Sequence, residues 1–322
     1  MLRPFRRLPL AATLASVLAL LAAGPARADY PDKPIRLIVG PGPDILARII
    51  GEKLTAAWGQ PVVVDQRPAA GGVVAGDSVA KAAPDGYTLL LSTGSYTVNS
   101  ALRAKAPYDF QRDLTPVSLM ATLPFILVVH PSVPVKGVKD LVALAQSQPG
   151  KLNYASSGNG TPSHLSGEML KQMAKVDIVH VAYKGAAPAL TDVLGGQVQL
   201  SFLPAPTALP LVKSGKLHAI GVSSPKRYAA LPDVPTIAEQ GYPDFSVVGW
   251  NGIHVPARTP APVIDKLNRE IAAILKQPEA REKAAGAGFE AVGSSREEFE
   301  AFVKADIAKA TAVIKAGNIQ PD

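Results

Sequence analysis

The feature that most constrains the fold is a repeated alternation between short apolar runs and stretches with helical periodicity. The apolar runs are four to eight residues long, which is the usual length of a strand. The predicted strands are 35–39, 61–64, 87–91, 125–129, 152–155, 178–181, 198–202, 217–222 and 247–254. The predicted helices are 45–54, 73–81, 138–146, 163–174, 186–194, 262–275 and 296–314. This alternation predicts an α/β fold with parallel sheets that helices cover on both faces.

Such a fold also indicates where a ligand would bind. Right-handed crossovers bring the loops that follow the strands to one edge of each sheet. Open α/β sheets bind their ligands at that edge. The loops that come directly after the predicted strands are therefore the ones that matter for function.

The first 28 residues have the pattern of an export signal. Arg3, Arg6 and Arg7 precede an apolar run over 8–23, and Ala26-Arg27-Ala28 is a small-x-small cleavage sequence. We expect cleavage near Ala28, general secretory export and a periplasmic mature protein. Twin-arginine export and a retained membrane anchor stay open as alternatives.

The charge balance gives no reason to expect nucleic acid as a partner. The chain has 33 basic and 26 acidic residues, a formal charge of +7. Four of the basic residues lie in the predicted signal, so the mature chain has 29 basic against 26 acidic residues, a formal charge of +3. No basic run with interleaved aromatic residues follows the signal. No apolar run after the signal approaches the 18 residues that suggest a membrane span, which predicts a soluble protein.

Cysteine is absent, which excludes disulfides and cysteine-ligated metals. The histidines are His130, His164, His180, His218 and His254, and their spacing matches no metal-ligand pattern. We therefore predict no metal and no cofactor.

Four loops after predicted strands are rich in glycine, serine and threonine, and we predict that they bind a small anion. Glycine lets a backbone approach a ligand closely, and free N–H groups at a helix start favour negative charge. About four hydrogen bonds to a charged group, at roughly 1.5–3 kcal/mol each, suffice for micromolar binding without an arginine. Tyr183, after another predicted strand, is placed at the rim of the same site. The candidate ligand-binding residues are Gly42, Gly71, Gly72, Ser92, Thr93, Ser95, Ser157, Gly158, Asn159, Gly160, Thr161 and Tyr183.

The fourth loop, 156–164, combines small residues, hydroxyl groups and a helix start, so it is the strongest candidate. We expect Ser157 and Thr161 to donate to a ligand carboxylate, with the N–H groups of Gly158 and Gly160 nearby. The structural alternative is an ordinary turn in which Thr161 or Ser163 caps the helix.

Catalytic motifs are incomplete, and we predict no catalytic residue. The stretch Gly76-Asp77-Ser78-Val79-Ala80 lacks the last glycine of a nucleophile elbow and lies in a predicted helix. Gly158-Asn159-Gly160 begins a dinucleotide fingerprint, but Ser163 replaces its third glycine. An exported serine hydrolase remains an alternative function, which would need a serine and a histidine paired in the cleft.

Several segments, in this order, resemble the Bug family, the receptors of tripartite tricarboxylate transporters. They run from about Tyr30 to the C-terminus. They are Tyr30-Pro31-Asp32-Lys33-Pro34-Ile35-Arg36, Gln60-Pro61-Val62-Val63-Val64, Ala83-Pro84-Asp85-Gly86-Tyr87-Thr88-Leu89-Leu90, Val129-His130-Pro131-Ser132, Gly160-Thr161-Pro162-Ser163-His164-Leu165, Tyr183-Lys184-Gly185 and Leu194-Gly195-Gly196-Gln197-Val198.

The resemblance implies a two-lobed periplasmic-binding-protein fold, a type II-like Venus flytrap with two crossing segments. It also implies a small carboxylate ligand and integral-membrane permease subunits as partners. We expect a monomer whose first lobe comprises 29–124 and 251–322, and whose second lobe comprises 125–250. A sensor that signals to a membrane protein is an alternative with the same fold.

The chain departs from the family pattern at two loops. The first loop, 40–44, is several residues shorter than is usual in the family, and Leu203-Pro204 replaces an Asp-Asn-like pair. Two of the residues in 40–43 are prolines without an N–H donor. We therefore expect the first lobe to bind mainly through Gly71-Gly72 and 92–95, and Asp44 to cap the helix after the first loop.

Overall fold

The computed structural model describes residues 30–40, 44–67, 70–102 and 106–320. The predicted signal, residues 1–28, and Gly42 lie outside these ranges. All of the described helices and strands lie in the unit that begins at Lys33. None of these helices is long and apolar enough to cross a membrane.

The strands form a mixed sheet in which two parallel groups are joined through antiparallel strands. Their order is β2-β1-β3-β9-β4-β7-β5-β6, and β8 and β10 also pair with β4. The strands are β1 (Ile35–Val39), β2 (Val62–Gln66), β3 (Thr88–Thr93), β4 (Leu114–Val129), β5 (Asn153–Ser156), β6 (Val179–Ala182), β7 (Leu200–Pro204), β8 (His218–Val222), β9 (Val248–Pro256) and β10 (Glu290–Ala291).

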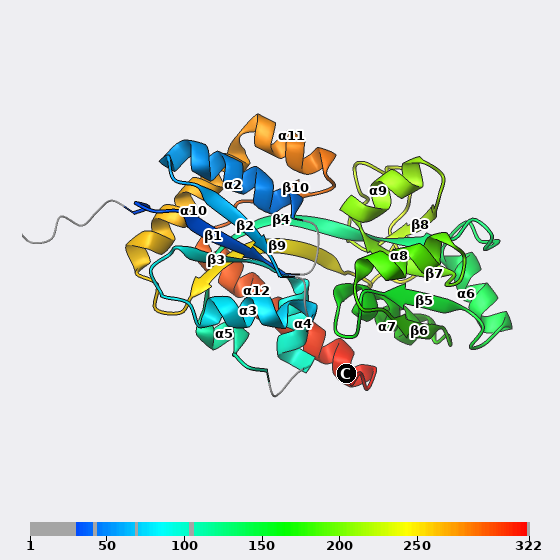
Figure 1. Cartoon of the computed structure of the whole chain (residues 1–322). Coiled ribbons are helices and arrows are strands. Elements are labelled where there is room, and N and C mark those ends of the chain that lie inside the picture. Colours follow the sequence, from blue (N-terminus) through cyan, green and yellow to red (C-terminus); the bar gives the residue numbers. More distant parts are fainter. Residues whose placement is uncertain (1–29, 41–43, 68–69, 103–105, 321–322) are drawn as a thin grey trace, which may run out of the picture. The chain divides into compact units, whose positions relative to one another are not determined.

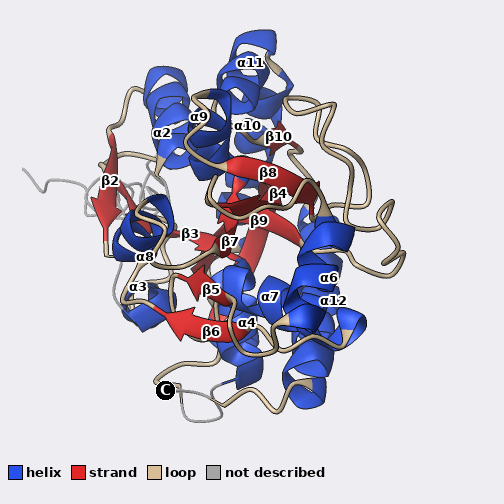
Figure 2. Cartoon of the chain, turned by 90° about the vertical axis from the view of Figure 1, so that its right-hand side faces the viewer, coloured by secondary structure: helices blue, strands red, loops and turns tan. Residues whose placement is uncertain are grey.

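The helices pack around these strands (Figures 1 and 2). They are α2 (Ile45–Trp58), a 3-10 turn η1 (Ala70–Gly72), α3 (Val73–Ala80), α4 (Gly94–Leu102), α5 (Phe110–Asp113), α6 (Val138–Ser147), α7 (Pro162–Ala174), α8 (Ala186–Leu194), α9 (Ala205–Lys213), α10 (Ala261–Lys276), α11 (Pro278–Gly286) and α12 (Arg296–Ala316).

Strand β4 belongs to both halves of the sheet, as Figure 1 shows. Its first part, up to Pro124, pairs with β9, and its second part, from Phe125, pairs with β7 and β8. We call β1, β2, β3, β9, β10 and the first part of β4 the first sheet. The second sheet is β5 to β8 with the second part of β4. Each sheet has its own buried apolar clusters, so the chain has the two-lobed α/β fold that was predicted.

Parallel strands carry the loops of interest in both sheets. Strands β1, β2 and β3 run parallel, and so do β5, β6 and β7. The prediction of purely parallel sheets was wrong, because β9 pairs antiparallel with β3 and β4, and β4 pairs antiparallel with β7 and β8.

Every predicted strand and helix overlaps an observed one, but helix ends were predicted with mixed success. Helix α12 begins with a capping box, in which Ser295 Oγ accepts the Glu298 N–H and the Glu298 carboxylate accepts the Ser295 N–H. The prediction for Asp44 was wrong. It occupies the N-cap position of α2, but its carboxylate makes no capping hydrogen bond and pairs with Arg48 instead.

Candidate functional site

The segment 92–95 is not a loop, contrary to the prediction. Ser92 and Thr93 end β3, and α4 begins at Gly94. The Ser92 hydroxyl is fully buried, lies 3.0 Å from the Gly252 carbonyl oxygen and 2.7 Å from His254 Nδ1. Thr93 Oγ1 accepts the Ser95 N–H at 3.3 Å, and no described residue pairs with the Ser95 hydroxyl. Of these side chains, only Ser95 therefore keeps a free hydroxyl at the start of α4.

The second predicted loop, 67–72, ends in a turn at Gly71–Gly72 that is tied to α4 through Asn99, a residue that the sequence analysis did not select. Asn99 Nδ2 donates to the Gly71 carbonyl at 3.0 Å and to the Ser95 carbonyl at 2.8 Å. Gly71 and Gly72 have φ angles of 62° and 98°, a region that favours glycine. Asn99 therefore holds the turn that leads into α3.

Loop 157–161 uses most of its predicted donors internally. The Gly158 N–H donates to Ser156 Oγ, and the Gly160 N–H donates to His164 Nδ1, both at 3.2 Å. The Thr161 hydroxyl donates to the Gly158 carbonyl at 2.8 Å and accepts the His164 N–H as the N-cap of α7. The structural alternative, capping by Thr161, is thus confirmed. The hydroxyl of Ser157 has no partner among the described residues.

Two stacked histidines, His164 and His180, contact this loop through hydrogen bonds. His180 Nε2 lies 2.7 Å from Ser156 Oγ, and its ring stacks on His164 with centroids 4.0 Å apart. Burial, helped by the neighbouring His164 and Lys171, lowers the pKa of His180 to about 3. His180 is therefore neutral at neutral pH. The histidines are scattered along the sequence, so nothing there indicated that His180 supports this loop.

The loops of the two sheets meet at α4. A Cβ placed on Gly160 would lie 2.9 Å from a Leu102 methyl group and 3.6 Å from Asn99 Oδ1. Asn99 therefore lies between Gly71 of the second loop and Gly160 of the fourth. This convergence brings Gly71, Ser95, Asn99 and the fourth loop into one neighbourhood.

Tyr183 reaches this neighbourhood through its backbone. Its carbonyl oxygen lies 3.2 Å from the position of a Cβ on Gly158. Its phenol donates instead to Asp192 on α8 at 2.5 Å, and burial with this hydrogen bond raises the pKa of Tyr183 to about 12.

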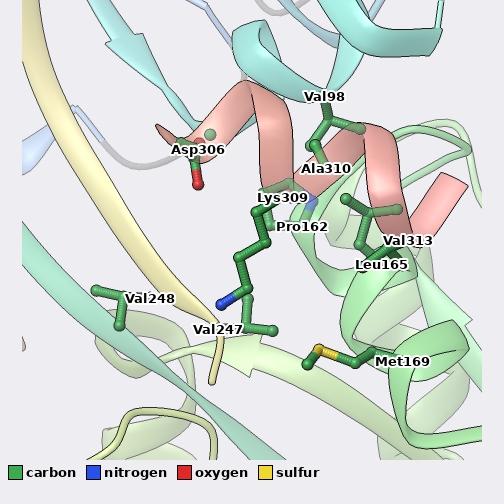
Figure 3. A pocket seen from close by; sticks show the side chains of 11 residues that line it. Val98, Pro162, Leu165, Met169, Val247, Val248, Asp306, Lys309, Ala310 and Val313 are labelled. Carbon is green, nitrogen blue, oxygen red and sulfur yellow. The ribbon is translucent and has the colours of Figure 1, made fainter. Parts of the chain in front are cut away.

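A separate pocket lies where α4, α7 and α12 pack together (Figure 3). Asp306 in it accepts from Thr97 and Trp250, at 2.6 and 2.9 Å, and the Lys309 ammonium donates to the Ser246 carbonyl. Both charged groups thus have partners within the protein, and Asp306 would repel an anion. This pocket is a poor carboxylate site. The apolar residues that line it are Val98, Pro162, Leu165, Met169, Val247, Val248, Ala310 and Val313.

The two serine–histidine contacts in which the serine is buried, Ser92–His254 and Ser156–His180, lack the features of a catalytic pair. Ser92 and Ser156 are 0% and 1% exposed, and their hydroxyls already bond within the protein, to the carbonyls of Gly252 and Gly158. No carboxylate of a described residue bonds to His180 or His254, so neither pair is extended to a triad. Nor do the described residues contain a group of three metal-ligating side chains.

The comparisons with known proteins give the family. Residues 46–319 match the family model of the tripartite tricarboxylate transporter family receptor, TctC. The chain is 35% identical to Protein BugT of Bordetella pertussis over 300 residues, which is 91% of this chain and 92% of BugT. The chain therefore belongs to the TctC/Bug family of periplasmic solute-binding receptors, as its resemblance predicted.

Solved structures agree with this assignment. One described as R. palustris Rpa4515 with adipate has 35% sequence identity and a TM-score of 0.87, covering 91% of this chain and all of that one. MatC (Rpa3494) from Rhodopseudomonas palustris with bound malate has 30% identity and a TM-score of 0.81, covering 88% of this chain and all of that one. Both of those proteins carry small dicarboxylates.

Proposed function

We propose that this protein is an extracytoplasmic receptor that captures a small carboxylate and delivers it to a tripartite tricarboxylate-type membrane permease. The observation that carries this proposal is the convergence of Gly71, Ser95 and loop 157–161 around Asn99 in a chain of this family. Adipate and malate on related proteins support a dicarboxylate. The proposed receptor is a monomer. It uses no catalytic residue, cofactor or metal, and it does not bind nucleic acid.

In the proposed site, the hydroxyls of Ser95 and Ser157 are the side-chain donors. The backbone of Gly71, Gly72 and 157–161 surrounds them, with Tyr183 against loop 157–161. Thr93 and Thr161 position these groups, since their own hydroxyls are engaged within the protein. Ser92 bonds to Gly252 in the core and is left out of the proposed site. Gly42 is included in the proposed site only because of its position in the sequence.

We further propose that the lobes divide as 29–124 with 251–322, and 125–250. The change of partners within β4 at Phe125 supports the first boundary. On the return, Val247 donates to Ser223 of the second lobe, whereas Val248 pairs with Pro124. This register favours a second crossing at Val247–Val248, slightly before Asn251.

Thermal unfolding of the mature chain with adipate and malate tests the binding function. A ligand at about 100 times its Kd stabilises the folded state by about 2.7 kcal/mol. Ser157→Ala and Ser95→Ala should each weaken binding by about 1–3 kcal/mol, because a charged partner loses a donor. Ser147→Ala, at an exposed position of α6, is the matched control and should bind normally. Absence of stabilisation by any small carboxylate at millimolar concentration contradicts the proposal.

Export and delivery need cell experiments. Fractionation should place the mature protein in the periplasm, with a new N-terminus near Asp29. Uptake of the bound carboxylate should require both this receptor and its permease. A sensor would bind the same carboxylate but leave its uptake unchanged when deleted.

A further inference from the structure

The Tyr96 hydroxyl is buried without a hydrogen-bond partner. Tyr96 lies on α4, is 2% exposed and stacks on Phe110 with ring centroids 5.6 Å apart. Within the described residues, its hydroxyl oxygen neither donates nor accepts a hydrogen bond. A buried polar group in this state costs about 1–3 kcal/mol, so its retention calls for an explanation.

This hydroxyl lies where β1 ends and α3 begins. A Cβ added to Gly40, the residue after β1, would overlap the Tyr96 hydroxyl and lie 3.4 Å from Gly72 Cα. The Tyr96 hydroxyl therefore lies between the end of β1 and the Gly71–Gly72 turn, which Asn99 holds through Gly71.

The start of α3 offers complementary groups. Its N-cap is Gly72, which has no side chain to accept the N–H groups of the first turn. These N–H groups and the positive end of the helix dipole favour an anion. Burial raises the pKa of Tyr96 far above its usual range, so its phenol stays protonated and can donate.

We propose that the Tyr96 hydroxyl donates a hydrogen bond to a carboxylate oxygen of the ligand, at the start of α3 between Gly40 and Gly72. This inference rests on the function proposed above and adds a donor to its site. The first loop supplies few donors, since two of the residues in 40–43 are prolines. Tyr96 supplies one next to Gly40. The carboxylate in turn provides the partner that the phenol lacks among the described residues.

Tyr96→Phe tests this inference, because stability and binding should change in opposite directions. Removal of an unpartnered hydroxyl should leave the ligand-free protein as stable as the wild type or more stable. The affinity for adipate or malate, measured by calorimetry, should fall about 10- to 150-fold, the loss expected for a hydrogen bond to a charged group.

Tyr228→Phe is a matched control. Tyr228 is 4% exposed, and its hydroxyl is likewise buried without a partner among the described residues. It packs in an apolar cluster of the second sheet, whereas Tyr96 packs in one of the first sheet. This variant should show the same stability change as Tyr96→Phe and bind carboxylates like the wild type.

The outcomes separate this inference from the proposed function. A selective loss of affinity in Tyr96→Phe supports the inference. Equal affinity of Tyr96→Phe and the wild type for both probes overturns it and leaves the receptor function standing. If the wild type binds neither probe nor any other small carboxylate, both proposals are overturned together.

Discussion

Two serine–histidine contacts, one in each sheet, differ in what surrounds them. Ser92 and His254 lie 2.7 Å apart at the end of β3, and Ser156 and His180 lie 2.7 Å apart at the end of β5. His254 is 1% exposed and contacts the rings of Phe110 and Phe299. His180 lies on the edge strand β6, stacked between Tyr154 and His164.

The same contact therefore has two structural consequences. In the first sheet, Ser92 also bonds to Gly252, so the pair ties β3 to β9 within the core. In the second sheet, Ser156 bonds to both the N–H and the carbonyl of Gly158, so the pair shapes a proposed ligand loop. The first pair should matter mainly for stability, and the second mainly for binding.

The largest expected effect on stability comes from removal of the buried His254 ring. His254→Ala leaves a cavity between aromatic rings and takes a partner from Ser92, so we expect a loss of about 3 kcal/mol. His180→Ala, at the edge of the second sheet, should lose about 1 kcal/mol. Urea unfolding of both variants measures the difference. Equal losses, or a larger loss in His180→Ala, would contradict the comparison.

The pH dependence of stability tests the burial of His254. Burial lowers the pKa of His254 to about 3, against about 6.5 in an unfolded chain. Below pH 6.5 the unfolded chain binds a proton that folded His254 does not, so stability falls as the pH falls. Between pH 6.5 and 4.5 this one group should remove about 2 kcal/mol.

His254→Gln should remove that share of the pH dependence. Its unfolding free energy, measured by urea titration at several pH values, should fall less steeply than that of the wild type. His218→Gln, which changes an exposed histidine, is the control and should follow the wild type. If both variants keep the wild-type slope, His254 is not the titrating group.

The periodicity of the sequence predicted the sheets well but missed elements whose stability comes from packing. Helix α4 contains Gly94, Thr97 and Asn99, which are weak helix formers, and yet almost all of its residues are buried. The first part of β4 contains Pro116 and Pro124, which argue against a strand. It forms because β9 pairs along it, with register shifts. Neither cause is visible in a local window.

The candidate site was predictable as loops but not as hydrogen bonds. Glycine and hydroxyl content pointed correctly to the ends of the parallel strands. The partners of Gly158, Gly160 and Thr161 lie within the loop itself or on α7, so these groups are engaged before any ligand arrives. Asn99 and Tyr96 escaped notice because their roles depend on Gly71 and Gly40, which are distant in the sequence.

The smallest expected effect isolates the role of each serine. Ser156→Ala removes the side chain that holds Gly158, and Ser92→Ala removes the one that bonds to Gly252. Each change should cost about 1 kcal/mol of stability, the value of a typical hydrogen bond. Only Ser156→Ala should also weaken carboxylate binding, by several-fold, because loop 157–161 loses its internal support. Paired urea unfolding and calorimetry measure both quantities for each variant. If Ser92→Ala weakens binding as much as Ser156→Ala does, the two pairs share one role and the division between core and loop is wrong.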